Sequence, residues 1–363
     1  MCILTKVLII GGGVSGLRLG SLLAKEDISF KILESRERVG GRVLTHNQDN
    51  NYFDLGPTWF WPDTEKTITN LITELNIPTI EQYNEGFSLL ELSKHQTPKY
   101  VESSELNNKS RRIVGGISAL VNVLKDSIST SNIELNKKVT SVIKNKNGTI
   151  TVNTYDELKN NRINYNADIL VLTLPPRLLL ENISFKPSLP ENIQIDLLSK
   201  PTWMGAQAKI VVTFDKAFWR DVNLSGNVVS WAGPLREIYD ASTERDESAL
   251  FGFFSLPPSI RNQYDKEAIH NKVIDQLVRL FGPKAKYYNN IFYKDWSQDK
   301  HTVTEGDKLN IESFPSYGQP PKYAENVIFS GTEYDEQHGG HLEGALSSSE
   351  KAYYKIKKLM SYK

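Results

Sequence analysis

Three glycines near the start of the chain have the spacing of a turn that binds phosphate. They are Gly11, Gly13 and Gly16, and an apolar run at 7–10 precedes them. In this pattern the first glycine permits a tight turn, the second lets the backbone approach a diphosphate, and the third lets a helix pack closely on a strand. The spacing therefore predicts a strand, a turn and a helix around a bound dinucleotide.

The residues that follow complete this unit. An apolar-periodic segment at 14–23 predicts a helix, whose first residues, Val14 and Ser15, would offer free backbone N–H groups and a partial positive charge to phosphate. A second apolar strand at 30–33 ends at Glu34. An acid at this distance can bind a ribose diol. Because strand, helix, strand and acid occur together, an isolated glycine-rich turn is the less favoured interpretation.

A lysine in the middle of the chain could bring positive charge to a reaction centre. Lys209 lies in a segment, 203–214, whose period of two predicts a strand. One face of that strand would carry Ala208, Ile210, Val212 and Phe214, and the other would carry Gln207, Lys209, Val211 and Thr213. A lysine on the solvated face of an antiparallel strand is the simpler interpretation, and a lysine aimed into a buried site is the other.

The composition is that of an ordinary globular protein. The 363 residues include 43 Lys+Arg and 43 Asp+Glu, so the formal net charge is zero. Without a basic cluster, nucleic acid is not an expected partner, and without a run of about 18 apolar residues no membrane span is expected. The single cysteine, Cys2, excludes an internal disulfide and a cysteine-ligated metal cluster. We expect a cytoplasmic protein without a metal site, long enough for two domains.

The segment after the second strand resembles a known family. The sequence RVGGRVLT at 38–45 resembles the RxGGRxxT stretch of the flavin-containing amine oxidases, which include monoamine, polyamine and L-amino-acid oxidases. This resemblance implies FAD as the cofactor, with Arg36, Gly41 and Arg42 among its contacts. A guanidinium suits a second contact to the diphosphate because it can bind two oxygens at once.

Three further segments carry the same resemblance. They are DLGPTW at 54–59, GAQAK at 205–209, and the ending GTE at 331–333 followed by GHLEGA at 340–345. The resemblance implies that the final helix points its N-terminus at the flavin, where its dipole would stabilise negative charge. For Val139, which the resemblance makes a cofactor contact, an ordinary strand residue is an equal alternative. By resemblance the remaining cofactor contacts are Gly56, Pro57, Thr58, Val139, Gly331, Glu333 and Leu342.

The resemblance also implies catalytic and substrate contacts. In the family, the lysine at the Lys209 position holds a water against flavin N5, which favours the buried interpretation of this residue. Trp59, Trp296, His338 and His341 would contact the substrate. His341 stands where many members have a cage tyrosine, so it is expected as a substrate contact or a base, with a solvated loop residue an equal alternative. Core packing is an equal alternative for Trp59.

The chain departs from the family pattern at three places. Glu305 stands near the position of the flavin-linking cysteine of covalent members, so we expect FAD to bind without a covalent link. Gly306 replaces one of the two cage tyrosines. The stretch between Thr58 and Gly115 is also far shorter than in monoamine and polyamine oxidases, which predicts a reduced substrate lid.

These expectations define a two-domain α/β flavoprotein. A Rossmann-like FAD-binding domain would comprise 1–66, 109–183 and 294–363. An α+β substrate domain, built on an antiparallel sheet, would comprise 67–108 and 184–293.

The expected reaction is FAD-dependent oxidation of a C–N bond of an amine or amino acid to an imine, with O2 as acceptor and H2O2 as product. A desaturase or an oxidase of a larger biosynthetic substrate is the alternative on the same fold, and the short lid and missing cage tyrosine favour it. A protein that binds FAD only structurally is a third class. The intact Lys209 and the glycines before the final helix argue against that class.

Overall fold

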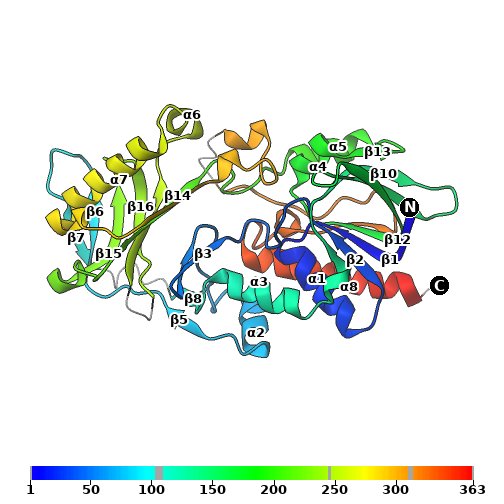
Figure 1. Cartoon of the computed structure of the whole chain (residues 1–363), viewed down its shortest axis with the longest axis horizontal. Coiled ribbons are helices and arrows are strands. Elements are labelled where there is room, and N and C mark those ends of the chain that lie inside the picture. The colour runs from blue at the N-terminus through cyan, green and yellow to red at the C-terminus, as the bar shows by residue number, and fades with distance from the viewer. Residues whose placement is uncertain (1, 103–108, 244–246, 310–313, 362–363) are drawn as a thin grey trace.

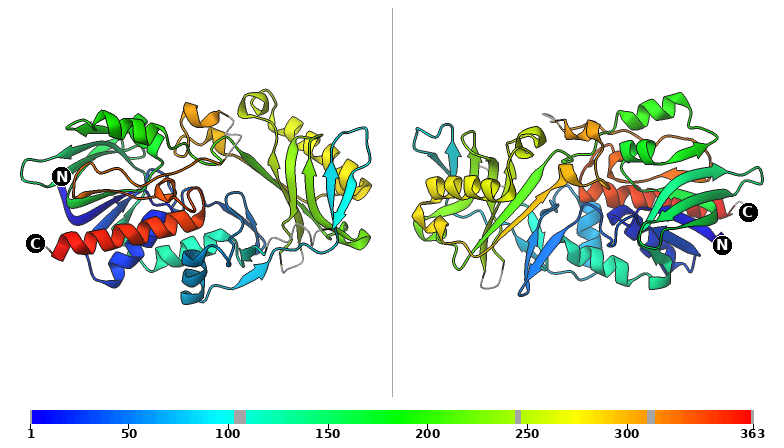
Figure 2. Two further views of the ribbon diagram at one scale, coloured as in Figure 1. Left: turned by 180° about the vertical axis from the view of Figure 1, so that it is seen from behind. Right: turned by 45° about the horizontal axis from the view of Figure 1, so that its top comes forward.

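The computed structural model describes residues 2–102, 109–243, 247–309 and 314–361. It has two lobes along its longest axis, and both chain termini belong to one of them (Figure 1). Figure 2 shows the same separation from behind and with the top of the molecule tilted forward. No helix in the described part of the chain has both the length and the apolar character that a membrane span requires.

The first lobe is built on an eight-stranded sheet with the order β13-β10-β11-β12-β1-β2-β9, in which β19 also pairs with β12. The pairs among β19, β12, β1, β2 and β9 are parallel, whereas β10, β11 and β12 form an antiparallel meander. The strands are β1 (Cys2–Ile10), β2 (Phe30–Leu33), β9 (Ile133–Glu134), β10 (Lys137–Lys144), β11 (Ile150–Asp156), β12 (Asn161–Leu172), β13 (Ser184–Lys186) and β19 (Val327–Phe329).

Elements on both faces cover this sheet, which explains the unbroken apolar run of β1. Val7 and Ile9 pack with one buried cluster, while Leu8 and Ile10 pack with the other. A parallel sheet covered on both faces requires such a run. The first cluster includes α1 (Val14–Lys25), α2 (Lys66–Glu74), α3 (Ile117–Asp126) and α8 (Leu342–Ser361), and the second includes α4 (Pro176–Asn182) and α5 (Glu191–Leu198).

The second lobe is a seven-stranded sheet with the order β18-β14-β17-β16-β15-β6-β7. Its pairs are antiparallel except β15 with β6, which is parallel. The elements are β6 (Phe87–Glu91), β7 (Lys99–Glu102), β14 (Ala208–Phe214), β15 (Leu224–Ser230), β16 (Leu235–Asp240), β17 (Ser248–Phe254), β18 (Ile291–Asp295), α6 (Pro258–Arg261) and α7 (Lys266–Phe281). Apolar residues of α7 pack on one face of this sheet.

Two further sheets of two antiparallel strands each complete the fold. They are β3 (Thr45–Gln48) with β4 (Asn51–Asp54), and β5 (Thr79–Glu81) with β8 (Arg111–Ile113). Phe53 of β4 packs with Val211 of β14 and Phe251 of β17. The second sheet is therefore covered by α7 on one face and meets the first lobe on the other, which is why every residue of β14 is buried.

The predicted domain limits differ from the observed packing at three places. Helix α2, assigned to the substrate domain within 67–108, packs its apolar stripe into the core of the first lobe. The segment 184–198 does the same, since β13 pairs with β10 and α5 joins the same core. Strand β18 crosses the limit at 293/294 and pairs with β14. An amphipathic stripe shows that a segment is buried but not against which layer. Within the predicted substrate-domain segment 67–108, residues 103–108 lie outside the described residues.

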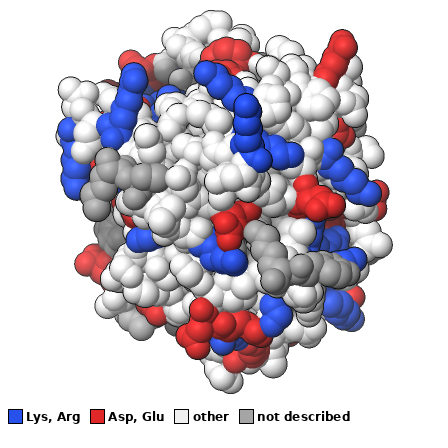
Figure 3. Space-filling model, turned by 90° about the vertical axis from the view of Figure 1, so that its right-hand side faces the viewer, with Lys and Arg blue, Asp and Glu red and all other residues white. Residues whose placement is uncertain are grey.

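The surface carries charges of both signs. Figure 3 shows the end of the molecule formed by the first lobe, where Lys and Arg are interspersed with Asp and Glu. This face therefore presents no large field of one sign.

Candidate active site

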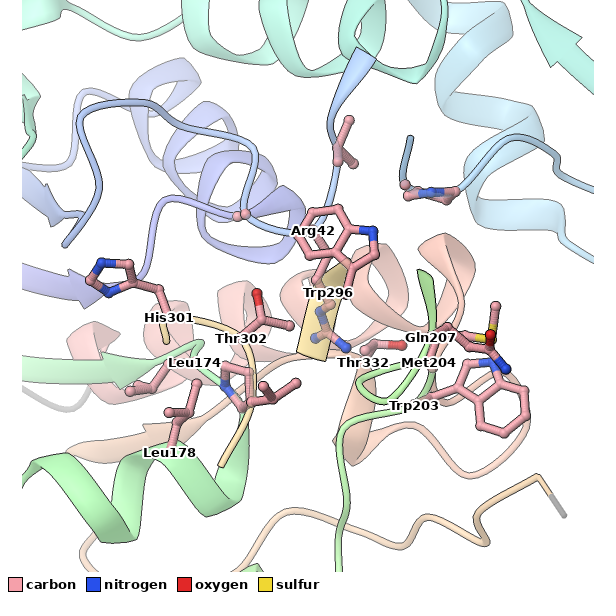
Figure 4. A pocket seen from close by; sticks show the side chains of 18 of the residues that line it. Arg42, Leu174, Leu178, Trp203, Met204, Gln207, Trp296, His301, Thr302 and Thr332 are labelled. Atoms are coloured by element: carbon pink, nitrogen blue, oxygen red, sulfur yellow. The ribbon is translucent and has the colours of Figure 1, made fainter. Parts of the chain in front are cut away.

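A cavity of ≈ 1050 Å³ is lined by residues of both lobes. Figure 4 shows how side chains from distant segments converge on it, with Arg42 and Trp296 at the centre, His301 on one side and Trp203 and Gln207 on the other. Three residues predicted for the site do not line the cavity: Gly16, Glu333 and His338. The predicted residues that do are Gly11, Gly13, Val14, Ser15, Glu34, Arg36, Gly41, Arg42, Gly56, Pro57, Thr58, Trp59, Val139, Lys209, Trp296, Gly331, His341 and Leu342.

Glycine is required at each of the three positions of the first turn for a different structural reason. Gly11 has a φ of +111°, and a Cβ there would lie 2.6 Å from Thr173 Oγ1. A Cβ on Gly16 would lie 2.0 Å from the carbonyl oxygen of Gly11, so Gly16 sets the contact between helix and strand. Gly13 has an ordinary φ of −76°, and the nearest atom to a Cβ there is Gly41 Cα at 4.0 Å. A Cβ at Gly13 would therefore occupy the cavity and would not clash with the protein.

Glu34 and Arg36 are held by the turn and by the opposite wall of the cavity. Glu34 is buried, with Oε2 accepting a hydrogen bond from Gly12 N at 2.7 Å and Oε1 accepting one from Arg36 N at 2.9 Å. The Arg36 guanidinium donates to Asp299 Oδ1 and to Thr302 Oγ1, both at 2.8 Å. Arg36 thus ties the end of β2 to the segment that returns from the second lobe.

Arg42 and Glu333 form an ion pair that the sequence did not indicate. Arg42 Nη1 lies 2.7 Å from Glu333 Oε1, and the Glu333 side chain is 1% exposed. Glu333 lies behind the cavity wall, while Arg42 lines the cavity. The carboxylate therefore orients the guanidinium, and Arg42 presents its charge to the cavity.

Lys209 is buried, which excludes the solvated-strand interpretation. It is 1% exposed, and its Nζ donates to the carbonyl oxygen of Gly56 at 3.0 Å and to Thr58 Oγ1. The ammonium also lies 4.1 Å from the ring centroid of Phe251. Burial lowers the pKa of Lys209 to about 7, although the charge of Asp54 acts in the opposite direction. Its role in the reaction stays a prediction.

An aromatic and acidic cluster closes the other end of the cavity. The His341 ring stacks on Trp61 with centroids 5.7 Å apart, and its Nδ1 lies 2.9 Å from Glu65 Oε1. Glu65 is buried and its Oε2 accepts a hydrogen bond from Trp61 N at 2.9 Å. Phe314 packs edge-on against His341 and also contacts Trp203. His341 is therefore neither isolated nor simply solvated.

The three consecutive aromatic residues at 59–61 lie in two different environments. Phe60 is in the core of the first lobe. Trp59 and Trp61 line the cavity, and Trp59 Nε1 donates to Gln82 Oε1 at 2.9 Å. Sequence reasoning missed Glu65 and Trp203. An acidic residue just before a helix is typical of a helix N-terminus. Nothing in the sequence therefore distinguished Glu65 as a residue of the site.

Comparisons with known proteins identify the family. A model of the flavin containing amine oxidoreductases matches residues 81–352, and a model of the NAD(P)-binding Rossmann-like domain matches residues 9–75. The chain belongs to the flavin containing amine oxidoreductase family. Members of this family use FAD. The cavity fits such a group, because its glycine turn leaves the backbone of Gly13 and Gly41 uncovered where a Cβ would intrude.

Full-length relatives support this membership. The chain is 23% identical over its whole length to the whole of a probable flavin-containing monoamine oxidase A of Dictyostelium discoideum. It is 23% identical to polyamine oxidase 4 of Oryza sativa subsp. japonica, with 94% of the chain and 86% of the relative aligned.

The fold is shared with solved oxidases of the family. Wild-type putrescine oxidase bound to putrescine matches 99% of the chain and 100% of that protein with a TM-score of 0.82 and 19% identity. Cyclohexylamine oxidase from Brevibacterium oxydans matches 98% and 99% with a TM-score of 0.79 and 17% identity. This likeness confirms the predicted pair of an α/β Rossmann-like domain and an α+β domain.

Proposed function

We propose that this amine oxidoreductase oxidises the C–N bond of a primary or secondary amine to an imine and passes the electrons to O2. The observation that carries the proposal is one cavity that runs from the glycine turn, suited to a diphosphate, to an aromatic end with a buried carboxylate. The amine loses two electrons and two protons. O2 accepts the two electrons and the two protons and is released as H2O2, while water hydrolyses the imine.

The glycine turn and Arg42 would hold the cofactor. The backbone of Gly13, Val14 and Ser15 at the start of α1 and the Arg42 guanidinium face the cavity as donors for a diphosphate, and Glu34 faces it as an acceptor for a ribose. FAD, when bound, supplies the two-electron redox chemistry. The protein contributes orientation, a site shielded from water, and fixed charges.

The charge at the aromatic end favours a cationic substrate. Glu65 is buried, and in the described ranges the only basic side chain within ion-pairing distance of it is His341. An ionised carboxylate removed from water needs a compensating cation. An ammonium supplies one, whereas the carboxylate of an amino acid would be repelled. We therefore favour amines over amino acids, and the putrescine in the related oxidase agrees with that class.

Lys209 would act at the step that reduces O2. It reaches the cavity beside Gly56 and Thr58, with its ammonium otherwise enclosed by aromatic rings. A positive charge in a water-poor site stabilises negative charge that develops as O2 gains electrons.

The test is a panel of amines and amino acids mixed anaerobically with the FAD-loaded protein. We expect aliphatic amines to bleach the flavin absorbance and, after air is admitted, to yield H2O2 in equal amount to the amine consumed. Bleaching without peroxide would replace O2 by another acceptor. Bleaching only by substrates without an amine would favour the desaturase or biosynthetic-oxidase alternative, and no bleaching by any compound would leave FAD with a structural role.

Attachment of the cofactor has its own test. The chain's single cysteine, Cys2, begins β1, at the opposite end of that strand from the glycine turn. A nine-residue strand spans about 30 Å, so a thioether to the flavin ring is out of reach. We expect acid precipitation to release all the FAD into the supernatant. Yellow colour that stays with the precipitated chain would contradict this.

A further inference from the structure

We propose that Glu65, His338 and His341 form a binding site for a divalent transition-metal ion of the Zn²⁺ type. Each of the three side chains offers one ligand atom, and these atoms lie within 4.8 Å of one another. Two imidazoles and one carboxylate are a donor set that suits Zn²⁺ and Co²⁺ rather than Mg²⁺ or Ca²⁺, which prefer oxygen ligands. The carboxylate is buried, whereas both histidines are half-buried.

A tight turn brings the two histidines to one side of the chain. His341 N donates to the carbonyl oxygen of His338 at 3.1 Å, and Thr332 Oγ1 donates to the carbonyl oxygen of His341 at 2.7 Å. Gly340 has a φ of +82°, and a Cβ there would lie 3.0 Å from the Trp203 side chain. The turn is therefore fixed by hydrogen bonds and packing before any ion binds.

A second carboxylate fixes the turn relative to Glu65. Glu343, in the first turn of α8, accepts hydrogen bonds from Thr67 N and Ile68 N, both at 2.8 Å. These are free N–H groups at the start of α2, directly after Glu65. Glu343 thus joins the start of α8 to the start of α2. The ligands come from segments far apart in the sequence, yet their backbones are held together independently of the metal.

The geometry needs only a small adjustment to coordinate an ion. Zn–N and Zn–O distances of about 2.0–2.2 Å place tetrahedral ligand atoms roughly 3.3–3.5 Å apart. The 2.9 Å contact between His341 Nδ1 and Glu65 Oε1 is already closer than this, and the half-buried imidazoles can move over the remaining difference. The hydrogen bond from Trp61 N orients Glu65 as an outer-shell partner would.

The open coordination positions would face the cavity. Glu65 and His341 line it, so an ion held between them and His338 exposes its remaining positions there. Three protein ligands with an open position are the arrangement of accessible zinc sites. This ion and the ammonium of an amine would need the same carboxylate. Zn²⁺ is therefore a competitive inhibitor of amine oxidation, a consequence that rests on the proposed function, whereas binding of the ion does not.

The experiment titrates the FAD-loaded protein, free of any histidine tag, with ZnCl2 by calorimetry and with CoCl2 by visible absorbance. We expect one Zn²⁺ per chain and intense visible Co²⁺ bands typical of four-coordinate nitrogen and oxygen ligation. His338→Ala and Glu65→Gln should each raise the dissociation constant at least tenfold. The control, His95→Ala, removes an exposed histidine on the β6–β7 connection and should leave the constant unchanged.

The outcomes separate the two proposals. Any of three results would overturn the metal site. They are no heat on addition of Zn²⁺ to the wild type, an unchanged Zn²⁺ dissociation constant in both His338→Ala and Glu65→Gln, and weak Co²⁺ bands typical of octahedral coordination. The Co²⁺ spectrum of the wild type decides the matter even if a variant does not fold. Because these titrations contain no amine, an inactive enzyme that binds Zn²⁺ at this site would refute the proposed function and leave the metal site standing.

Discussion

The two ends of the cavity are built from different materials. At the cofactor end the backbone of a glycine turn and of Gly41 faces the cavity, and charged side chains stand behind or beside it. At the other end the wall is made of side chains, chiefly Trp61, Trp203, Glu65 and His341. A cavity wall made of backbone forms only where the residues lack side chains. A wall made of side chains is determined by which segments of the chain pack together there.

This difference accounts for what each end can bind. Backbone N–H groups at a helix start recognise any diphosphate, so this end is suited to a cofactor that a whole family shares. The aromatic end combines the stacked Trp61–His341 pair with a buried acid, which selects for charge and shape. Cofactor binding and substrate choice should therefore respond to separate substitutions.

The largest expected effect contrasts two glycines of the same turn. Gly13→Ala places a Cβ in the cavity without a clash in the protein, so the chain should fold normally while the dissociation constant of FAD rises at least about tenfold. Gly16→Ala places a Cβ 2.0 Å from the Gly11 oxygen and should reduce the stability of the fold itself by roughly 1–3 kcal/mol. Fluorescence titration with FAD and thermal melts of the FAD-free chains distinguish the two. Equal FAD affinity in Gly13→Ala and wild type would refute the backbone-cradle assignment.

Most of the residues predicted for the cofactor end line one cavity for a physical reason. Gly11, Gly13, Gly16 and Glu34 lie within one supersecondary unit, so their mutual positions follow from local spacing. The substrate end could not be assembled in this way. Glu65 meets His341 only because α2 and α8 pack together, and that contact joins residues 276 positions apart.

The same limit explains why the packing differs from the predicted domain limits at α2 and α5. Both α2 and α5 carry apolar residues that are buried, but each of the two sheets offers an apolar face. Only the strand pairing of β13 with β10 and the packing of α2 on α8 decide in favour of the first lobe.

The next effect concerns the charge at the substrate end. Glu65→Gln keeps an acceptor for Trp61 N but removes the negative charge, so we expect the KM of an amine substrate to rise about 10- to 100-fold with a smaller change in kcat. Steady-state peroxide formation measures both constants. The matched control is Glu181→Gln, a cavity-lining carboxylate on α4 that is exposed and should leave KM within about twofold. An unchanged KM in Glu65→Gln would remove Glu65 from substrate recognition.

A smaller effect is expected where the lobes meet at Lys209. Lys209→Met keeps most of the apolar volume but removes the charge and the donor to Gly56 and Thr58. FAD should still bind, reduction by the amine should slow modestly, and reaction of the reduced enzyme with O2 should slow at least about tenfold, or roughly 1.4 kcal/mol of barrier. Stopped-flow mixing with oxygenated buffer follows that step alone. A variant that reacts with O2 at the wild-type rate would limit Lys209 to a structural role.

The last test examines the burial of Lys209 through the pH dependence of stability. Its pKa is 10.5 unperturbed and about 7 in the folded chain, because burial disfavours the ammonium more than Asp54 stabilises it. Between these values the unfolded chain binds more protons than the folded one, so the contribution of Lys209 to stability rises with pH across this window, by roughly 1 kcal/mol per pH unit. Below about pH 7 both states are protonated and the folded state carries the full cost of the buried charge.

The same argument fixes the behaviour of Lys209→Met, which has no charge to bury. Relative to wild type, its free energy of unfolding should be highest near about pH 6.5, and this advantage should shrink as the pH approaches about 9.5. Urea unfolding of both proteins with excess FAD measures the difference at each pH. Lys99→Met, which replaces an exposed lysine of β7, is the control and should differ from wild type equally at all pH values. A Lys209→Met difference that is just as flat would mean that Lys209 keeps its proton, so that Asp54 and the hydrogen bonds to Gly56 and Thr58 outweigh the burial.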